Sequence, residues 1–397
     1  MKTMFNTLWL IVILLAIASC KKTKNEEIIT PSDNNKLVIV NDVSGTVYGI
    51  NAQTGTPVWK AENPGGSPGN YISSPGVTAD AVLFADMGNS RLRTYNTVTG
   101  VLSWSKNYIY SSYYASPLVE NNMVYVANNE KVTGYIIESG AAVKEFNVPY
   151  YYTANSINKT NNMFIVATCG GHLFGVNTDG IKQWEYQSNI GCYHNNPAIN
   201  KGTIYILTSN GILSAVNAAT GAELWKRDEG AYAQNAAVVY YDGMLFVTGN
   251  GNKAYAFEAY DGDLVHTYTL PDNEYIYNYA APAVYDGKLY LISNEATVVA
   301  FDINGESIAM QKKLDMPGGR MAGRISFDNR TETVYSISSV VIANNTLFVS
   351  AGKAVYALSM KGDVKWSFTA QDYIFNSPVV LTDFNKTYRS GNAGIVE

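Results

Sequence analysis

Eight glycines recur along this chain, each inside the same short motif of strand, tight turn and strand. They are Gly55, Gly100, Gly140, Gly180, Gly221, Gly262, Gly305 and Gly362, and the gaps between them are 45, 40, 40, 41, 41, 43 and 57 residues. Such a turn needs a residue that tolerates a positive φ, which explains the glycine. A period of about 40–45 residues, with room for four short strands, is typical of a β-propeller. The repeat therefore predicts one ring of blades, although 397 residues are enough for two or three domains.

A second regularity accompanies each glycine. The strand before the turn has a small residue at its centre, in chain order Gly49, Thr94, Gly134, Gly175, Ala215, Ala256, Ala300 and Ala357. Four residues after the glycine, five copies have a tryptophan (Trp59, Trp104, Trp184, Trp225 and Trp366), and the other three have Lys144, His266 and Ala309. An indole on the outermost strand needs a flat surface, and a small side chain on the adjacent strand provides one. We therefore predict that the five tryptophans are structural docking residues.

The two ends of the repeat array predict how the ring closes. The first blade begins at its second strand, Leu37, whereas the segment Asn376–Val380 is left over after the last blade. Pairing Val379 beside Leu37 would supply the missing inner strand and remove an exposed sheet edge. The prediction is an all-β fold, an eight-bladed β-propeller of four-stranded antiparallel blades. Seven blades are the alternative, if the degenerate Gly140 copy does not form a blade.

The motif of small residue, turn glycine and tryptophan, which we call the docking motif, resembles the repeat of the pyrroloquinoline-quinone (PQQ) propeller superfamily. Its fullest copies here run from Asn51 through Gly55 to Trp59 and from Asn217 through Gly221 to Trp225. The Trp-Asp and paired-Gly signatures of WD40 and kelch repeats are absent from the sequence.

The first residues are expected to lie outside the ring. A short apolar run ends in Ile17-Ala18-Ser19-Cys20, which resembles the lipobox of bacterial lipoproteins and implies cleavage before Cys20 and lipidation of that residue. The alternative is an ordinary signal peptide with a chance cysteine. The predicted organisation is a signal peptide over 1–19, a flexible polar tether over 20–35 and a propeller over 36–397, with an inserted loop over 314–334.

Composition narrows the classes of partner. The net charge is −5 and no basic stripe is present, which argues against nucleic acid. Tyrosine is abundant, with 30 residues. Every outer-to-inner connection carries one, at Tyr71, Tyr113, Tyr152, Tyr193, Tyr232, Tyr277, Tyr335 and Tyr373. These repeated tyrosines either wedge between blades with bonded hydroxyls or form an aromatic rim, and their symmetry favours the structural role.

Further aromatic and basic residues crowd some of these connections and break the symmetry. They are Tyr108, Tyr110, Tyr114, Tyr150, Tyr151, Tyr275, Tyr279 and Phe375, together with Arg320 and Arg324 of the insertion. We predict that this set forms a face that contacts a ligand or partner.

Catalytic, cofactor and metal sites are not expected. The quinoprotein dehydrogenases of the superfamily use PQQ, calcium and often adjacent cysteines, and no adjacent cysteine pair exists here. The three histidines fall in different blades, and two histidines without a placed carboxylate make a poor metal site. Cys169 and Cys192 are expected on the same face of neighbouring blades, either as a disulfide or as two buried thiols.

The lipobox, the tether and the eight-bladed PQQ-like ring together resemble the family of outer membrane protein assembly factor B (BamB). The resemblance implies a non-enzymatic lipoprotein at the outer membrane, on its periplasmic or cell-surface side. It implies a scaffold whose partner is an envelope protein complex such as the β-barrel assembly machinery. The tyrosine-rich face leaves two alternatives open: a glycan-binding lipoprotein, and a degenerate quinoprotein dehydrogenase.

Overall fold

The chain divides into two units, Met1–Asn34 and Asn35–Glu397. The computed structural model describes residues 36–62, 74–86, 91–107, 117–128, 131–148, 154–160, 162–168, 170–188, 197–228, 237–249, 251–277, 279–327, 330–383 and 386–388, all in the second unit. The predictions on the signal peptide, Cys20, the tether, Cys169 and Cys192 therefore lie outside the described residues.

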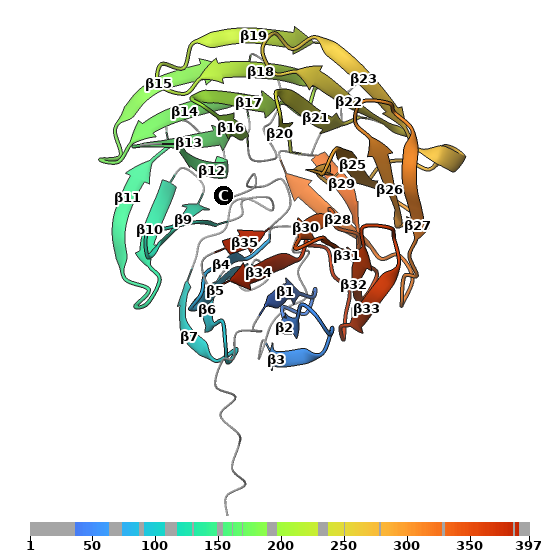
Figure 1. Cartoon of the computed structure of the whole chain (residues 1–397). Coiled ribbons are helices and arrows are strands. Elements are labelled where there is room, and N and C mark those ends of the chain that lie inside the picture. Colours follow the sequence, from blue (N-terminus) through green and yellow to red (C-terminus); the bar gives the residue numbers. More distant parts are fainter. Residues whose placement is uncertain are drawn as a thin grey trace, which may run out of the picture. The chain divides into compact units, whose positions relative to one another are not determined.

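The second unit is a ring of eight antiparallel blades, as predicted (Figure 1). Blades 1 to 4 contain β1 (Leu37–Asn41), β2 (Val47–Asn51), β3 (Pro57–Ala61), β34 (Val379–Asp383) and β35 (Lys386–Tyr388); β4 (Gly76–Val77), β5 (Ala81–Asp86), β6 (Arg91–Asn96) and β7 (Leu102–Asn107); β8 (Leu118–Glu120), β9 (Met123–Asn128), β10 (Lys131–Ile136) and β11 (Ala142–Asn147); and β12 (Ala154–Thr160), β13 (Met163–Thr168), β14 (His172–Asn177) and β15 (Lys182–Gln187).

Blades 5 to 8 repeat this pattern on the other half of the ring. They contain β16 (Ala198–Asn200), β17 (Thr203–Leu207), β18 (Ile212–Asn217) and β19 (Glu223–Asp228); β20 (Val239–Tyr241), β21 (Met244–Thr248), β22 (Lys253–Glu258) and β23 (Leu264–Thr269); β24 (Ala283–Tyr285), β25 (Lys288–Ile292), β26 (Thr297–Asp302) and β27 (Ile308–Lys313); and β30 (Val341–Ala343), β31 (Thr346–Ala351), β32 (Ala354–Ser359) and β33 (Val364–Thr369). A 3₁₀ turn, Pro271–Asn273, follows β23.

The C-terminal strand closes the ring as predicted, but its register differs by two residues from the predicted pairing of Val379 beside Leu37. Strand β34 pairs antiparallel with β1, with Ile39 opposite Val379 and Leu37 opposite Leu381. The short β35 adds a fifth strand inside β34. The Gly140 copy forms a complete blade, β8 to β11, so the seven-blade alternative is wrong.

The insertion between blades 7 and 8 differs from the expected loop. It contains a two-stranded hairpin, β28 (Ala322–Phe327) and β29 (Arg330–Tyr335), with Ala322 opposite Tyr335. The run Thr331-Glu332-Thr333-Val334 is rich in β-branched residues, which favour extended backbone.

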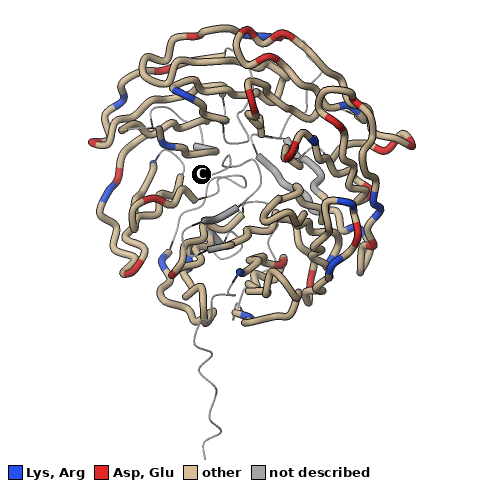
Figure 2. Tube along the Cα trace, viewed as in Figure 1, with Lys and Arg blue, Asp and Glu red and all other residues tan. Residues whose placement is uncertain are grey.

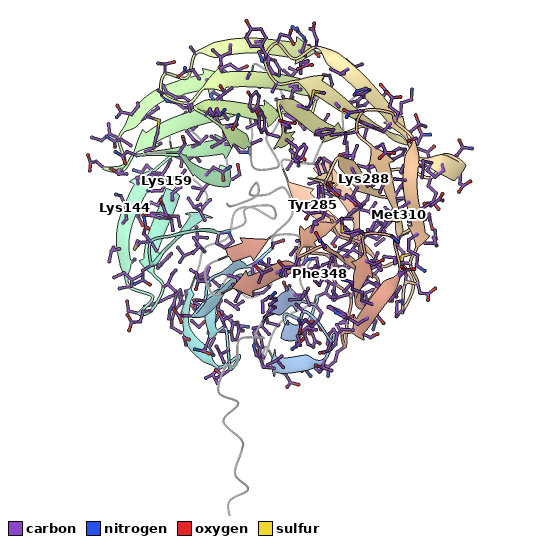
Figure 3. All side chains as sticks on the ribbon, viewed as in Figure 1. Lys144, Lys159, Tyr285, Lys288, Met310 and Phe348 are labelled. Carbon is purple, nitrogen blue, oxygen red and sulfur yellow. The ribbon has the colours of Figure 1, made fainter. Side chains whose placement is uncertain are left out.

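The docking position of blade 7 is also one residue later than predicted. Glu306, not Gly305, has the positive φ, at 55°, and its N–H donates to the carbonyl of Asp302. The residue opposite Ala300 is therefore Met310 rather than Ala309. Met310 is buried and Ala309 is exposed, so the sequence assignment of Ala309 was wrong by one position. Figure 3 shows Met310, and Lys144 of blade 3, on the outer strands.

Each of the five tryptophans joins its own blade to the next one. Its indole Nε1 donates to a backbone carbonyl in the following blade, from Trp59 to Thr97, Trp104 to Ile137, Trp184 to Ala218, Trp225 to Ala259 and Trp366 to Ala52, over 2.7–3.1 Å. The indole of Trp59 lies so close to Gly100 of blade 2 that a Cβ there would come within 2.6 Å of its ring. Glycine at this turn therefore serves both the positive φ and the close approach of the indole.

The three blades without a tryptophan use other contacts with the next blade. Phe146 packs against Gly180, and the Tyr268 hydroxyl donates to the carbonyl of Ile303 over 2.6 Å. The Sδ atom of Met310 would lie 3.1 Å from a Cβ on Gly362. A sequence pattern that searches for indoles alone misses these substitutes.

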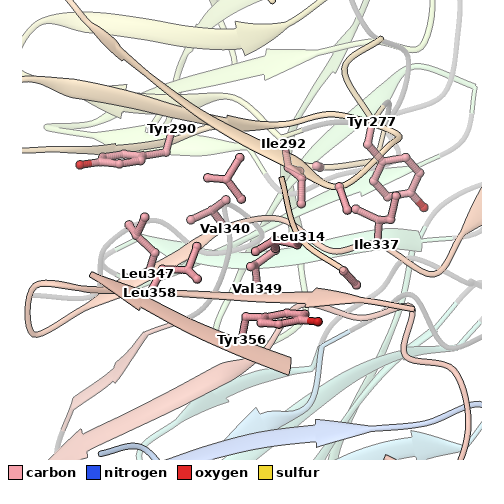
Figure 4. Packing of buried hydrophobic residues seen from close by; sticks show 14 of the residues in the cluster. Tyr277, Tyr290, Ile292, Leu314, Ile337, Val340, Leu347, Val349, Tyr356 and Leu358 are labelled. Carbon is pink, nitrogen blue, oxygen red and sulfur yellow. The ribbon is translucent and has the colours of Figure 1, made fainter. Parts of the chain in front are cut away.

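The hydrophobic core lies between blades. In the largest cluster, Tyr290, Ile292 and Val298 of blade 7 pack against Leu347 and Val349 of blade 8 (Figure 4). The apolar face of each sheet is thus covered by its neighbour, and the loops at the ends of the blades are left to form sites.

Candidate functional site

The structure describes part of the predicted aromatic face. Tyr108, Tyr110, Tyr114, Tyr150 and Tyr151, and five of the repeated tyrosines (Tyr71, Tyr113, Tyr152, Tyr193 and Tyr232), lie outside the described residues. The other tyrosines of the two predicted sets, and Phe375, lie in the connections between blades 6 and 7, 7 and 8, and 8 and 1. Two of them, Tyr275 and Tyr279, meet at one cavity.

This cavity, of about 220 Å³, is lined by Gly251, Tyr275, Ile276, Tyr277, Tyr279, Asn294 and Tyr335, and we call it the tyrosine cavity. Three segments bring these residues together. The N–H of Ile276 donates to the carbonyl of Gly251, and the N–H of Asn294 donates to that of Tyr275. The connection before β24 is thereby fixed to the β21–β22 turn of blade 6 and the β25–β26 turn of blade 7.

Tyr277 is the fixed wall of the cavity. Its side chain is 4% exposed, and its hydroxyl donates to the carbonyl of Tyr335 over 3.0 Å and accepts from the Tyr335 N–H over 3.1 Å. Burial raises the pKa of Tyr277, so the phenol stays neutral at physiological pH. A buried ring with both hydroxyl contacts used is a wedge between two connections, the structural role favoured for the repeated tyrosines.

Tyr275 and Tyr279 are placed differently from Tyr277. Tyr275 is 61% exposed and its ring passes over Gly251, where a Cβ would lie 3.9 Å away. The ring of Tyr279 lies 5.7 Å from that of Tyr277 at an interplanar angle of 48°. A large apolar ring held open to solvent beside a cavity is a typical contact residue in a binding site.

Arg320 of the insertion extends the site. Its Nη1 donates to the carbonyl of Asn294 and to Oε1 of Glu295, each over 2.8 Å. Its guanidinium lies 4.3 Å from the ring centroid of Tyr335, in a cation–π contact. Arg320 thus contacts Asn294 and Tyr335, which both line the tyrosine cavity, and its contact with a ligand or partner stays a prediction.

The charges near the cavity neutralise one another. Glu274 accepts from the hydroxyl of Ser293 and pairs with Lys313 at 3.2 Å, while Glu295 pairs with Arg320. Burial works against ionisation of Glu274, but these hydrogen bonds and the lysine hold its pKa below the ordinary value. A neutral, mainly aromatic cavity suits an uncharged group better than an ion.

Phe375 corrects the predicted face. Its side chain is 3% exposed, so it belongs to the core and cannot contact a partner. Arg324 lies in β28, opposite Thr333, and its side chain is outside the described part. Among the repeated tyrosines, Tyr373 donates to the carbonyl of Gly318 in the insertion over 2.5 Å.

Sequence reasoning missed Gly251 and Asn294. Both come from turns between the second and third strands, where no residue pattern marks them. Within the described ranges, no group of three His, Cys, Asp or Glu side chains is placed to hold a metal ion.

Two further cavities lie between blades, near the turns. The first, about 450 Å³, lies between blades 8 and 1, and we call it the closure pocket; its lining is Lys36, Ala52, Gln53, Ala343, Asn344, Thr346, Phe348, Lys365, Val380 and Thr382. The second, about 660 Å³, lies between blades 2 and 3 and is lined by residues that include Asp80, Ser103, Asn122 and Glu138. The sequence analysis did not find either one.

Indoles docked on the turns of following blades, in a ring closed by β34, define a PQQ-like eight-bladed propeller of the tryptophan-docking type. The family model described as outer membrane protein assembly factor BamB matches residues 8–161, 153–227 and 177–392. The chain therefore belongs to this family.

Curated relatives agree with this assignment at low identity. BamB of Yersinia pestis is 23% identical over 278 residues, which is 66% of this chain and 68% of the relative. BamB of Francisella tularensis is 27% identical over 179 residues, 42% of this chain and 38% of the relative. A tetrathionate hydrolase of Acidithiobacillus ferrooxidans is 24% identical over 252 residues, 47% of this chain and 50% of the relative. The last two alignments span half or less of those relatives.

Solved structures share the fold. BamB from Moraxella catarrhalis superposes with a TM-score of 0.58 at 15% identity, over 80% of this chain and 92% of that one. Dihydro-heme d1 dehydrogenase NirN superposes with a TM-score of 0.65 at 10% identity, over 92% of this chain and 77% of that one. At these identities the likeness establishes architecture alone, because one propeller can support both binding and catalysis.

In the portion of the chain that the structure describes, no helix has the length and apolar character needed to cross a membrane.

Proposed function

We propose that this chain is a non-enzymatic scaffold of the bacterial envelope that binds a protein partner in outer-membrane protein assembly. The observation that carries the proposal is the BamB family match along the whole ring. A closed, eight-bladed ring supports it physically, because docked blades fix the relative positions of the strand ends. A rigid frame lowers the entropy lost when a partner binds.

The tyrosine cavity is the part of the ring that we assign to partner contact. Tyr275 offers an exposed ring, and Arg320 is held in place by Glu295 and Tyr335. Tyrosine and arginine are the residues that most often dominate binding energy at protein interfaces. An uncharged apolar side chain from the partner fits a cavity whose neighbouring charges are already paired.

A pull-down from envelope extracts tests this assignment. The tagged chain is expected to recover components of the β-barrel assembly machinery, and Tyr275→Ala with Tyr279→Ala is expected to reduce that recovery. Tyr260→Ala is the matched control, because Tyr260 is 90% exposed but lies in the β22–β23 turn, away from the cavity. Recovery at the level of an untagged extract would contradict the scaffold function, and equal losses in all variants would contradict the site.

The lipid anchor is a second part of the proposal. The lipobox-like Ile17-Ala18-Ser19-Cys20 supports lipidation at Cys20, and residues 20–35 would tether the ring to the outer membrane, on the periplasmic or the cell-surface side. Cys20→Ser is expected to release the chain from the membrane fraction. Protease treatment of intact cells distinguishes the two sides, since surface-exposed chain is digested.

The absence of catalysis also needs a direct test, because a tetrathionate hydrolase is similar in sequence and NirN is similar in fold. We expect no dye reduction after incubation with PQQ and calcium, and no hydrolysis of tetrathionate. Activity in either assay would contradict the proposed non-enzymatic function and indicate an enzyme.

Glycan binding is a second candidate, favoured by one observation. Tyr275 is exposed, and its carbonyl accepts from the N–H of Asn294, whose own carbonyl accepts from Arg320. An aromatic ring and fixed polar groups at one site suit a neutral sugar. Retention on a polysaccharide gel, competed by free sugar and lost in Tyr275→Ala, would support it over a protein partner.

A further inference from the structure

We propose that the closure pocket, between blades 8 and 1, binds a phosphate group. Two lysines line it: Lys36, directly before β1, and Lys365 on β33. They approach from different blades, so the pocket exists only when the ring is closed. Phe348, labelled in Figure 3, forms part of its apolar wall.

The charge of this pocket departs from the repeat. In six blades the carbonyl of the residue before the second strand accepts a hydrogen bond from a backbone N–H in the turn between the third and fourth strands of the same blade. These residues are Lys36, Asp80, Asn122, Gly202, Gly243 and Gly287. None of the five counterparts of Lys36 is basic. The residues directly before the docking position are Val58, Ser103, Val143, Gln183, Leu224, Val265, Ala309 and Lys365. None of the seven counterparts of Lys365 is charged, so the closure pocket is the place where both positions became basic.

The pocket between blades 2 and 3 provides the contrast. Its equivalents of Lys36, Gln53 and Lys365 are Asn122, Glu138 and Ser103. The same cavity between blades is therefore acidic in one place and basic in the other. The backbone geometry is shared, so the side chains decide which ligand each cavity accepts.

The lysines of the closure pocket are available to an anion. Within the described chain, neither has a carboxylate within 4.0 Å, and the pocket lining contains no Asp or Glu. Lys365 Nζ lies 2.7 Å from Oγ1 of Thr346, which orients the ammonium group. Figure 2 shows acidic and basic residues interspersed around the ring, and the net charge is −5, so a basic pocket is not a product of overall charge.

Phosphate fits this donor set. Two ammonium groups balance about two negative charges, and a tetrahedral oxyanion leaves oxygen atoms for neutral donors such as Gln53 and Asn344. The volume of about 450 Å³ has room for a phosphate with an organic substituent. The source is either a free phosphate or the headgroup of an anionic lipid, which share this chemistry.

Calorimetric titration of the full chain in detergent tests the proposal with two probes. Inorganic phosphate represents the free source, and short-chain dioctanoyl phosphatidylglycerol represents the lipid headgroup. Tighter binding of the first assigns the free source, and tighter binding of the second assigns the lipid. The double variant Lys36→Gln with Lys365→Gln is expected to lower the affinity for the tighter-binding probe at least about tenfold. Added salt is also expected to lower this affinity. Lys361→Gln, an exposed lysine of the adjacent turn outside the pocket lining, is the control and should not change it.

A transfer of the site gives a second test. Asp80→Asn, Ser103→Lys, Asn122→Lys and Glu138→Gln remove both carboxylates from the pocket between blades 2 and 3 and place two lysines there, and this variant is expected to bind a second equivalent of the probe. The circular dichroism melting curve of each variant checks that it is folded. Absence of binding for both probes, or binding that the double lysine variant does not change, would overturn the proposal.

Discussion

The indole Nε1 of Trp366, in the last blade, lies 3.0 Å from the carbonyl oxygen of Ala52, in the first blade. The two residues are separated by 314 positions in the chain, yet their hydrogen bond repeats the one that joins Trp59 to Thr97 in consecutive blades. Ring closure thus uses the same contact as every other tryptophan-docked junction, together with the pairing of β34 and β1. Closing so long a loop is entropically costly, and these two contacts offset that cost.

Trp366→Phe should lower the free energy of unfolding by about 1–3 kcal/mol, because it leaves the Ala52 carbonyl without its donor. Trp225→Phe removes the corresponding bond between blades 5 and 6 and should cost a similar amount. Guanidinium unfolding followed by circular dichroism measures both. A cost below about 0.5 kcal/mol in both variants would show that the indole hydrogen bonds do not stabilise the ring.

Gly49→Ala should destabilise the first blade by about 1–3 kcal/mol through overpacking. A Cβ at Gly49 would lie 2.2 Å from Cε2 of Trp59, closer than any real contact, so the indole would have to move. Blade 5 already has Ala215 opposite Trp225, which shows that the sheet itself tolerates alanine. Trp59→Phe made in the Gly49→Ala background should therefore cost less than in the wild type, and additive costs would refute this steric explanation.

The fold could be predicted largely because the docking motif is local in the sequence. Small residue, turn glycine and tryptophan all lie within one hairpin, so their spacing along the chain records the contact between the indole and the small residue of its own blade. The contact with the turn glycine of the following blade then follows from the repeat. Blade 7 shows the limit of this argument. Its turn places Glu306 at a positive φ beside Gly305, and counting from the glycine misplaced the docking residue at Ala309 instead of Met310.

The candidate site was less accessible from the sequence. Tyr275 and Arg320 were selected by type, but their proximity depends on how three turns from two blades and the insertion meet. Gly251 and Asn294 carry no chemical signal in the sequence, because backbone position rather than side-chain chemistry places them at the cavity. Phe375 was selected by residue type, as the exposed Tyr275 was, and the sequence pattern does not show that its side chain is buried at 3% exposure.

Stability should fall above about pH 10. Burial raises the pKa of Tyr290 to about 12 and also raises that of Tyr268. A phenol whose pKa is raised in the folded state ionises first in the unfolded chain, near pH 10. Its contribution is therefore complete below pH 10 and is lost as the pH rises toward the folded value. Melting temperatures from pH 8 to pH 11.5 measure the effect, and Tyr290→Phe should flatten the decline; an unchanged melting temperature over this range would contradict the expectation.

Tyr277→Phe and Tyr275→Ala should separate the structural tyrosine of the cavity from the binding one. The Tyr277 hydroxyl satisfies both the N–H and the carbonyl of Tyr335, so its removal should cost about 1–3 kcal/mol of stability. Tyr275 is mostly exposed, so its truncation should change stability by less than about 0.5 kcal/mol and reduce partner recovery instead. Chemical denaturation measures the first effect and the envelope pull-down the second. The assignment fails if Tyr275→Ala unfolds the ring, because that ring would then belong to the core, or if Tyr277→Phe is as stable as the wild type.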